Sequence, residues 1–248
     1  MKRRRDLAIA ALGVLLVWQA AAMLLNNAIL PSPIAVIATF FAELGNGLLE
    51  HFLASLWRVV ASTALAILLA APAGLMLGQS RRLDSIFAPV VYLLYPVPKV
   101  VLVPVALLLL GVGDLPKIVI IFLVLFFQIL VLVRDQAASL RPELIESVRS
   151  LGAGRRALFR FVYLPASIPA ILTALRQSVG TAVAVLYVAE LFATRLGLGY
   201  YIYLNGSTLF NYRAMYAGIL AMSLLGLGLY FLVDWLERAA TPYRFVEQ

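Results

Sequence analysis

Long apolar runs, separated by short segments that hold most of the charges, dominate the pattern along this chain. Residues 118–133, for example, contain no charged side chain. A helix of about 20 apolar residues is long enough to cross the ~30 Å hydrocarbon core of a bilayer. The pattern therefore predicts an all-α membrane protein with six transmembrane helices, and their expected ranges are 7–25, 55–78, 86–110, 116–133, 168–190 and 213–234.

The third expected span is the least regular, because it contains prolines at positions 89, 96, 98 and 104. Each proline removes a backbone hydrogen-bond donor and disfavours a straight helix. At membrane depth such breaks are tolerated where protein or a water-filled path covers the backbone. We therefore expect an irregular helix in this part of the chain.

The composition supports a membrane protein. Hydrophobic residues make up 63% of the chain and charged residues 13%, with a mean hydropathy of +0.98, whereas soluble domains are roughly half apolar. The 248 residues predict a single membrane domain, 1–248, with no room for a second soluble domain. The uncharged stretch 7–25 is longer than the roughly 7 to 15 apolar residues of a cleaved signal peptide, so we expect it to remain as a helix.

The distribution of Lys and Arg predicts the orientation, because cytoplasmic segments of membrane proteins carry an excess of these residues. If the N-terminus lies inside, the inner segments hold most of the basic residues, and the outer segments hold only Lys117, Arg195 and Arg213. Both termini are therefore expected in the cytoplasm. The formal net charge of +8 then reflects topology, and we expect no binding of nucleic acid.

The chain lacks the residues that disulfides, metal sites, catalytic sites and nucleotide-binding loops require. The chain has no cysteine and a single histidine, His51, so we expect no disulfide, no metal site and no nucleophile–base pair of an enzyme. No lysine follows a glycine, so the phosphate-binding loop G-x-x-x-x-G-K-[ST] is missing. We expect no cofactor in this chain, and any ATP and Mg²⁺ must be bound by a partner.

The longest cytoplasmic stretch, residues 134–167, has the pattern of two short amphipathic helices. Pro142 suits the first turn of the first helix, and Gly152 offers its end. The expected apolar stripe of this helix consists of Leu144, Val148 and Leu151.

The second short helix is expected to place Arg156 and Arg160 on one face, before Pro165 and Pro169 mark the return to the membrane. A short helix with an apolar stripe and a basic flank suits a groove in a partner protein. The basic residues could instead hold the two helices on anionic lipid, and the residues alone leave both interpretations open.

At this point the chain resembles a known family. Glu146, Gly152 and Pro165 have the spacing of the EAA loop of ATP-binding-cassette (ABC) importer permeases. Three positions depart conservatively from that motif: Ser147, Val148 and Val162. Similarity to the nitrate, sulfonate and taurine branch extends over almost the whole chain, at residues 30–33, 55–59, 74, 78, 111–113, 189–191 and 197–199.

The resemblance implies a type I ABC importer permease fold with cytoplasmic coupling helices, in the inner membrane of a bacterium. It implies a second copy of the chain, two cytoplasmic ATPase subunits and an extracytoplasmic substrate-binding protein as partners. The expected cargo is a small anion such as a sulfonate, taurine or nitrate. The loop helix would enter a cleft on the ATPase through residues 142–165, with the coupling residues Glu146, Leu151, Gly152, Arg155, Arg156, Leu164 and Pro165.

Charged residues inside membrane spans are expensive and therefore suggest function. The candidates for the translocation path or gate are Glu190, Lys99 and Arg58. Glu190 could equally form an ion pair with Arg58, Arg176 or Arg195, and Lys99 could pair or extend its ammonium group towards the membrane surface.

Gly74 and Gly78 form a small-xxx-small pair that predicts close helix packing. The main alternative function is a secondary carrier driven by an ion gradient. Such a carrier would need intramembrane carboxylates, for which Glu190 and Asp234 are available, and no inverted repeat is apparent.

Overall fold

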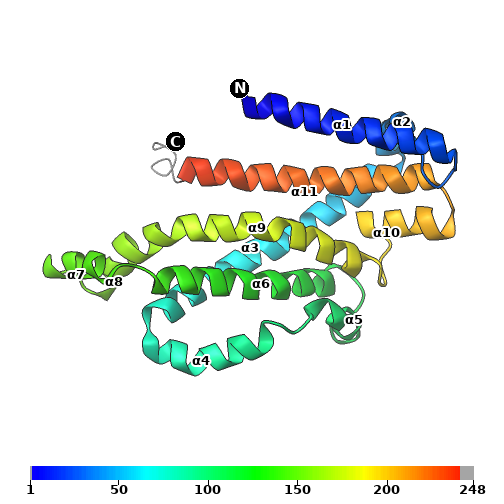
Figure 1. Ribbon diagram of the computed structural model, residues 1–248. Coiled ribbons are helices and arrows are strands. Elements are labelled where there is room, and N and C mark those ends of the chain that lie inside the picture. The colour runs from blue at the N-terminus through cyan, green and yellow to red at the C-terminus, as the bar shows by residue number, and fades with distance from the viewer. Residues whose placement is uncertain (1, 241–248) are drawn as a thin grey trace. The chain divides into compact units, whose positions relative to one another are not determined.

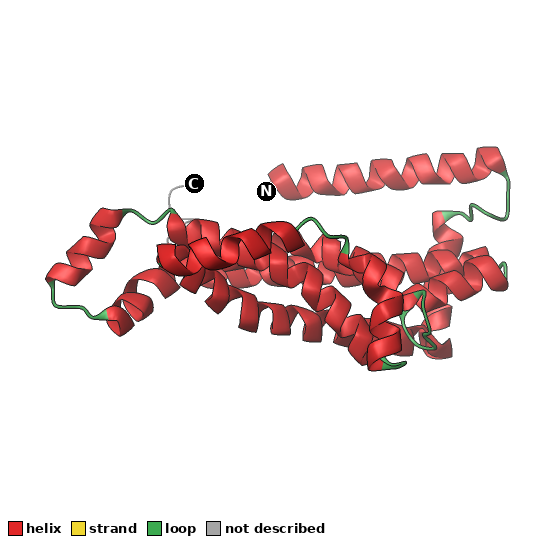
Figure 2. Cartoon of the chain, turned by 90° about the horizontal axis from the view of Figure 1, so that it is seen from below, coloured by secondary structure: helices red, strands yellow, loops and turns green. Residues whose placement is uncertain are grey.

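The structure is a computed structural model that describes residues 2–240, apart from the side chains of residues 2–5, 7, 8, 142 and 155. Within this range it consists of helices joined by short loops and contains no strand (Figure 2). The predicted all-α fold is confirmed.

The helices follow one another along the chain as Figure 1 shows. Their bounds are α1 (Lys2–Leu25), α2 (Pro33–Glu43), α3 (Leu49–Gln79), α4 (Arg81–Leu94), α5 (Val103–Leu110), α6 (Asp114–Ala138), α7 (Pro142–Ser150), α8 (Arg155–Leu158), α9 (Leu164–Glu190), α10 (Leu198–Tyr203) and α11 (Tyr212–Ala240). A 3₁₀-helical turn at Lys99–Leu102 precedes α5. Three π-helical turns lie at Leu44–Leu48, Phe159–Tyr163 and Leu204–Thr208.

Contacts group the chain into two compact units. The first unit runs up to Ser55 and includes Thr194–Leu224, and the second contains Leu56–Ala193 and continues from Leu225. The prediction of one membrane domain stays a prediction.

Four described helical stretches are long and apolar enough to cross a membrane, namely Pro33–Gln79, Asp114–Ala138, Arg156–Glu190 and Tyr212–Ala240. Arg81–Leu94 and Lys99–Leu110 meet the same test together, with a bend of 75° between them. In α1 the apolar part, Ile9–Leu25, is shorter. Each expected span thus lies on a helix or on the bent pair.

The bent pair is the stretch in which the prolines predicted an irregular helix. Pro96 and Pro98 lie in the break between α4 and the turn that precedes α5. Pro104 is in the first turn of α5, where a missing N–H costs no intrahelical hydrogen bond. Pro89 lies inside α4. The break therefore forms where two prolines stand close together.

A short helix, α8, precedes the long span α9, and Pro165 lies in the first turn of α9 while Pro169 lies inside it. The two prolines thus stand where the chain enters the span, and Arg156–Glu190 forms one continuous helical stretch. The π-helical turn Phe159–Tyr163 directly precedes α9, so the missing N–H of Pro165 falls where the hydrogen-bond register already changes.

Two glycines bring the backbone of α3 against α6. A Cβ atom on Gly74 would lie 2.8 Å from the carbonyl oxygen of Leu130, and one on Gly78 would lie 2.6 Å from Cβ of Ala137. Real Cβ atoms essentially never show contacts under 3.0 Å. No larger residue fits at either position unless the two helices move apart.

Replacing Gly78 with valine is expected to separate α3 from α6 and to lower the free energy of unfolding by about 1–3 kcal/mol, the usual cost of overpacking. The melting temperature of the detergent-purified protein measures this effect. Gly228→Val in α11 is the control, because a Cβ atom there meets nothing within 4 Å. Equal melting temperatures for the two variants would contradict the close packing.

Candidate functional site

The hairpin of α7 and α8 extends beyond the ends of α6 and α9 (Figure 1). α7 ends at Ser150, and Gly152 follows with a φ of +82°, a conformation that favours glycine. The Gly152 N–H donates to the carbonyl oxygen of Arg149 at 2.9 Å. A Cβ atom at Gly152 would meet nothing within 4 Å, so the backbone conformation, and not lack of space, selects glycine here. The predicted helix end at Gly152 is confirmed.

The apolar residues of α7 divide between the chain's own core and the surface. Ile145 and Val148 are partly buried against a small core that consists of Leu158, Val162 and Tyr163. Leu144 is 45% exposed and Leu151 is 83% exposed. Of the three residues in the expected stripe, Val148 thus packs inside the hairpin, and Leu144 and Leu151 remain uncovered.

The predicted coupling residues gather on this hairpin and at the start of α9. The exposed ones are Glu146, Leu151, Gly152, Arg156, Leu164 and Pro165. Arg155 begins α8, and its side chain lies outside the described residues. The hairpin thus presents apolar and charged groups together on an uncovered surface.

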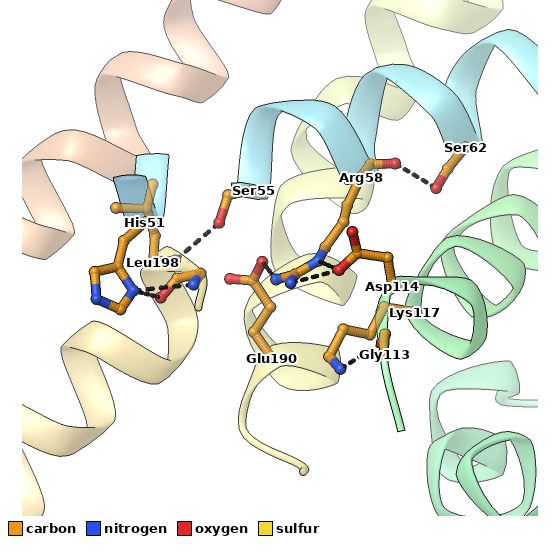
Figure 3. A network of polar contacts seen from close by, with 10 residues as sticks. His51, Ser55, Arg58, Ser62, Gly113, Asp114, Lys117, Glu190 and Leu198 are labelled. Carbon is orange, nitrogen blue, oxygen red and sulfur yellow. Dashed lines mark hydrogen bonds and ion pairs between the residues drawn. The ribbon is translucent and has the colours of Figure 1, made fainter. Parts of the chain in front are cut away.

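A cluster of four charged residues joins three helices of the second unit (Figure 3). Arg58 on α3 donates from Nη1 to Oε1 of Glu190 on α9 at 2.6 Å, and from Nη2 to Oδ1 of Asp114 on α6 at 2.7 Å. Nearby, Nζ of Lys117 donates to the carbonyl oxygen of Gly113 at 2.8 Å. Arg58 is 4% exposed, Lys117 is 2% exposed and Glu190 is completely buried.

Local structure places each member of the cluster. Asp114 lies in the first turn of α6, where a carboxylate is favoured by the helix dipole. Lys117 follows one turn later, and Glu190 is the last residue of α9. The planar guanidinium of Arg58 carries donors in a fixed fork, so it can serve two carboxylates at once. The cluster contains two positive and two negative groups, which limits the cost of burying them.

The structure selects among the ion pairs that the sequence left open for Glu190. Glu190 pairs with Arg58, while Arg176 contacts Asp234 at 3.4 Å and Glu237 at 3.0 Å. A role of Glu190 and Arg58 in the path or gate stays a prediction. Sequence reasoning missed Asp114 and Lys117 as members of the cluster, although their position at the start of an apolar run was a signal.

Lys99 also has partners inside the second unit. Its Nζ donates to the carbonyl oxygens of Leu94 and Tyr95 at 2.7 and 2.6 Å and lies 4.5 Å from the ring centroid of Phe127. These carbonyls stand at the C-terminal end of α4, where the helix dipole favours a cation. The geometry therefore supports the pairing alternative over direct contact with a solute.

In the first unit, polar contacts hold the start of α10. Leu198 N–H donates to Oγ of Ser55 at 2.8 Å, and Gly197 N–H lies 3.0 Å from Nδ1 of His51 (Figure 3). Tyr201 O–H donates to Glu43 at 3.0 Å, and burial together with this carboxylate raises the pKa of Tyr201. Among the described residues, no three His, Asp or Glu side chains form a group that could hold a metal ion.

Removing one member of the Arg58–Glu190 pair is expected to destabilise the protein by about 3–5 kcal/mol, because the other charge stays buried without its partner. We expect Arg58→Ala and Glu190→Ala each to lower the melting temperature, and the double variant to lose less than the sum. Glu143→Ala on the exposed surface of α7 is the control. Strictly additive losses would count against a direct ion pair.

Comparisons with known proteins identify the family. Residues 62–242 match the family described as binding-protein-dependent transport system inner membrane component. The taurine transport system permease protein TauC of Escherichia coli (strain K12) is 31% identical, over 98% of this chain and 91% of its own length. The putative aliphatic sulfonates transport permease protein SsuC of Bacillus subtilis (strain 168) is 29% identical, over 93% of this chain and 84% of its own.

A solved structure shares the fold. An inward-facing structure of the MetNI methionine ABC transporter contains a chain that aligns with a TM-score of 0.68 at 20% sequence identity, and the alignment covers 78% of this chain and 96% of that one. This likeness confirms the predicted importer permease fold. Because the family match covers most of the sequence, the chain belongs to the binding-protein-dependent transport system inner membrane components and is the permease subunit of an ABC importer.

Proposed function

We propose that this permease imports a small organic sulfonate, with taurine as the first candidate. The similarity to a taurine permease along nearly the whole chain supports this cargo, and the similarity to a sulfonate permease supports its chemical class. A substrate-binding protein on the outer side delivers the solute. Two copies of this chain enclose the translocation path, which runs between the two copies. The transporter stands in the bacterial inner membrane with both termini in the cytoplasm.

Residues 142–165 are proposed to contact the cytoplasmic ATPase, which binds ATP and Mg²⁺. The observation that supports this proposal is the exposed surface of the hairpin. Ile145 and Val148 pack α7 against the rest of the hairpin, whereas Leu144 and Leu151 are exposed and can contact a partner. A short helix that exposes apolar side chains beside Glu146 and Arg156 suits a groove in another protein.

The long helical stretch Arg156–Glu190 supports a direct mechanical link. Its first residues belong to the hairpin, and its last residue is paired with Arg58 on α3. A displacement of the hairpin by the ATPase therefore moves the whole of α9 and reaches α3 through the ion pair. This is a route by which ATP-driven closure can produce alternating access to the solute.

Gly152→Trp is expected to lower ATP-driven uptake at least about tenfold, because a side chain strains a backbone with positive φ and adds bulk to the docking surface. Proteoliposomes with the ATPase and the binding protein measure uptake and ATP hydrolysis together. Gly152→Asn is the control, because asparagine tolerates positive φ. Wild-type coupling in the tryptophan variant, at an unchanged melting temperature, would contradict docking through this turn.

The cargo is tested by uptake of radiolabelled taurine into the same proteoliposomes. We expect ATP-dependent uptake that an excess of an alkyl sulfonate reduces and an equal excess of nitrate does not. The reason is that a sulfonate shares the acceptor oxygens and the organic group of taurine. Inhibition by nitrate alone, or ATP hydrolysis without taurine uptake, would contradict the proposed cargo.

A further inference from the structure

Several charged side chains of the second unit's membrane spans have partners within the unit. Arg58, Asp114 and Glu190 form ion pairs at 2.6–2.7 Å, and Arg176 pairs with Glu237 at 3.0 Å. Both Lys99 and Lys117 donate to backbone carbonyls. Among the described groups of this unit, contact with a solute therefore falls more readily to neutral polar side chains.

A groove between α6 and α9 contains such side chains. It has a volume of about 400 Å³ and is lined by Gln136 from α6 and by Thr173 and Gln177 from α9, between small and apolar neighbours. The two helices pack side by side in Figure 1, and the groove lies toward the ends that meet the hairpin. With the expected orientation, this is the side on which the solute is released.

The exposed face of α9 lacks the residues of a lipid-facing surface. Between residues 166 and 190, its exposed residues are Gln177, Gly180 and Ala184, and none is a large apolar side chain. The contrast with α4 is strong, since the exposed residues there include Ile86, Phe87, Val90 and Leu93. Lipid tails favour large apolar groups, so α4 suits lipid and this face of α9 does not.

Gln128 provides an independent observation on α6. It lies two helical turns from Gln136, with Leu132 between them at the same spacing, so the three residues form one line along the helix. Oε1 of Gln128 is buried and has no hydrogen-bond partner among the described residues. A buried acceptor without a partner is costly, so this amide, which lies outside the lining of the groove, can accept from a donor that passes farther along this side of α6.

We propose that the groove between α6 and α9 is a binding site for the transported amino sulfonate on its way to the cytoplasm. The inference rests on the proposed cargo. Sulfonate oxygens accept hydrogen bonds, and the amide groups of Gln136 and Gln177 each offer two N–H donors. The amide oxygens of the same two side chains accept from the ammonium group of taurine. The hydroxyl of Thr173 donates to Glu237 on α11 at 3.2 Å, so its hydrogen is not offered to the solute.

Neutral amides suit a site that must release its ligand. A hydrogen bond from an amide to a charged acceptor is weaker than the paired contacts that an arginine makes with an anion. A transport site has to bind strongly enough to admit the solute and weakly enough to pass it on. The residues that line the groove include no charged side chain, so the amides are the polar groups that a solute meets there first.

The double variant Gln136→Leu/Gln177→Leu is expected to lower taurine uptake by about tenfold or more, since hydrogen bonds to a charged ligand are lost. The rate of ATP hydrolysis stimulated by the loaded binding protein should stay within about twofold of the wild type, because the hairpin is unchanged. Ser223→Leu in α11 is the control, because this polar side chain is exposed and does not line the groove, and its uptake should equal that of the wild type.

The ratio of uptake to hydrolysis decides the outcome. A lowered ratio in the double variant supports the site. An unchanged ratio overturns it, whether uptake and hydrolysis both stay at the wild-type level or fall together, as they would if the two glutamines only held subunits together. Failure of the proposed cargo gives a different result, in which the wild type itself hydrolyses ATP without taking up taurine, and this also overturns the inference.

Discussion

A charge inside a bilayer must be neutralised by a partner, and the second unit meets this constraint most clearly at Arg58. Its guanidinium reaches carboxylates on two other helices, so α3, α6 and α9 share one electrostatic joint. A lysine ammonium at this position would lack the planar fork that serves two acceptors. Lys99 meets the same constraint in another way, because the carbonyl oxygens of Leu94 and Tyr95 at the end of α4 accept hydrogen bonds from its ammonium group.

Because of these ion pairs, the hairpin at the other end of α9 is linked to α3 and α6. A hairpin on a flexible loop would move without affecting the membrane spans. Here the chain continues from α8 through a π-helical turn into α9 without a loop, so the hairpin and the joint are parts of one helical stretch. α8, one half of the hairpin, and the buried Glu190 are therefore parts of the same continuous helical stretch.

Periodicity and proline placement predicted the helical fold and the irregular third span, because a bilayer leaves few alternatives to helices. Gly152 predicted the end of α7 for an equally local reason. The sequence did not predict which residues far apart in the chain contact each other. Three arginines were open to Glu190 in the sequence, and only the packing of α3 against α9 selects Arg58. The carbonyl partners of Lys99 leave no sequence signal, since every residue has a carbonyl group.

Two contacts near opposite ends of α3 have a consequence for motion. Near one end the ion pair of Arg58 with Asp114 ties α3 to α6, and near the other end Gly74 and Gly78 press the two backbones together. Contacts at two separate points oppose both sliding and rotation of α3 relative to α6. Any relative motion of these two helices has to break the ion pair and separate the closely packed backbones.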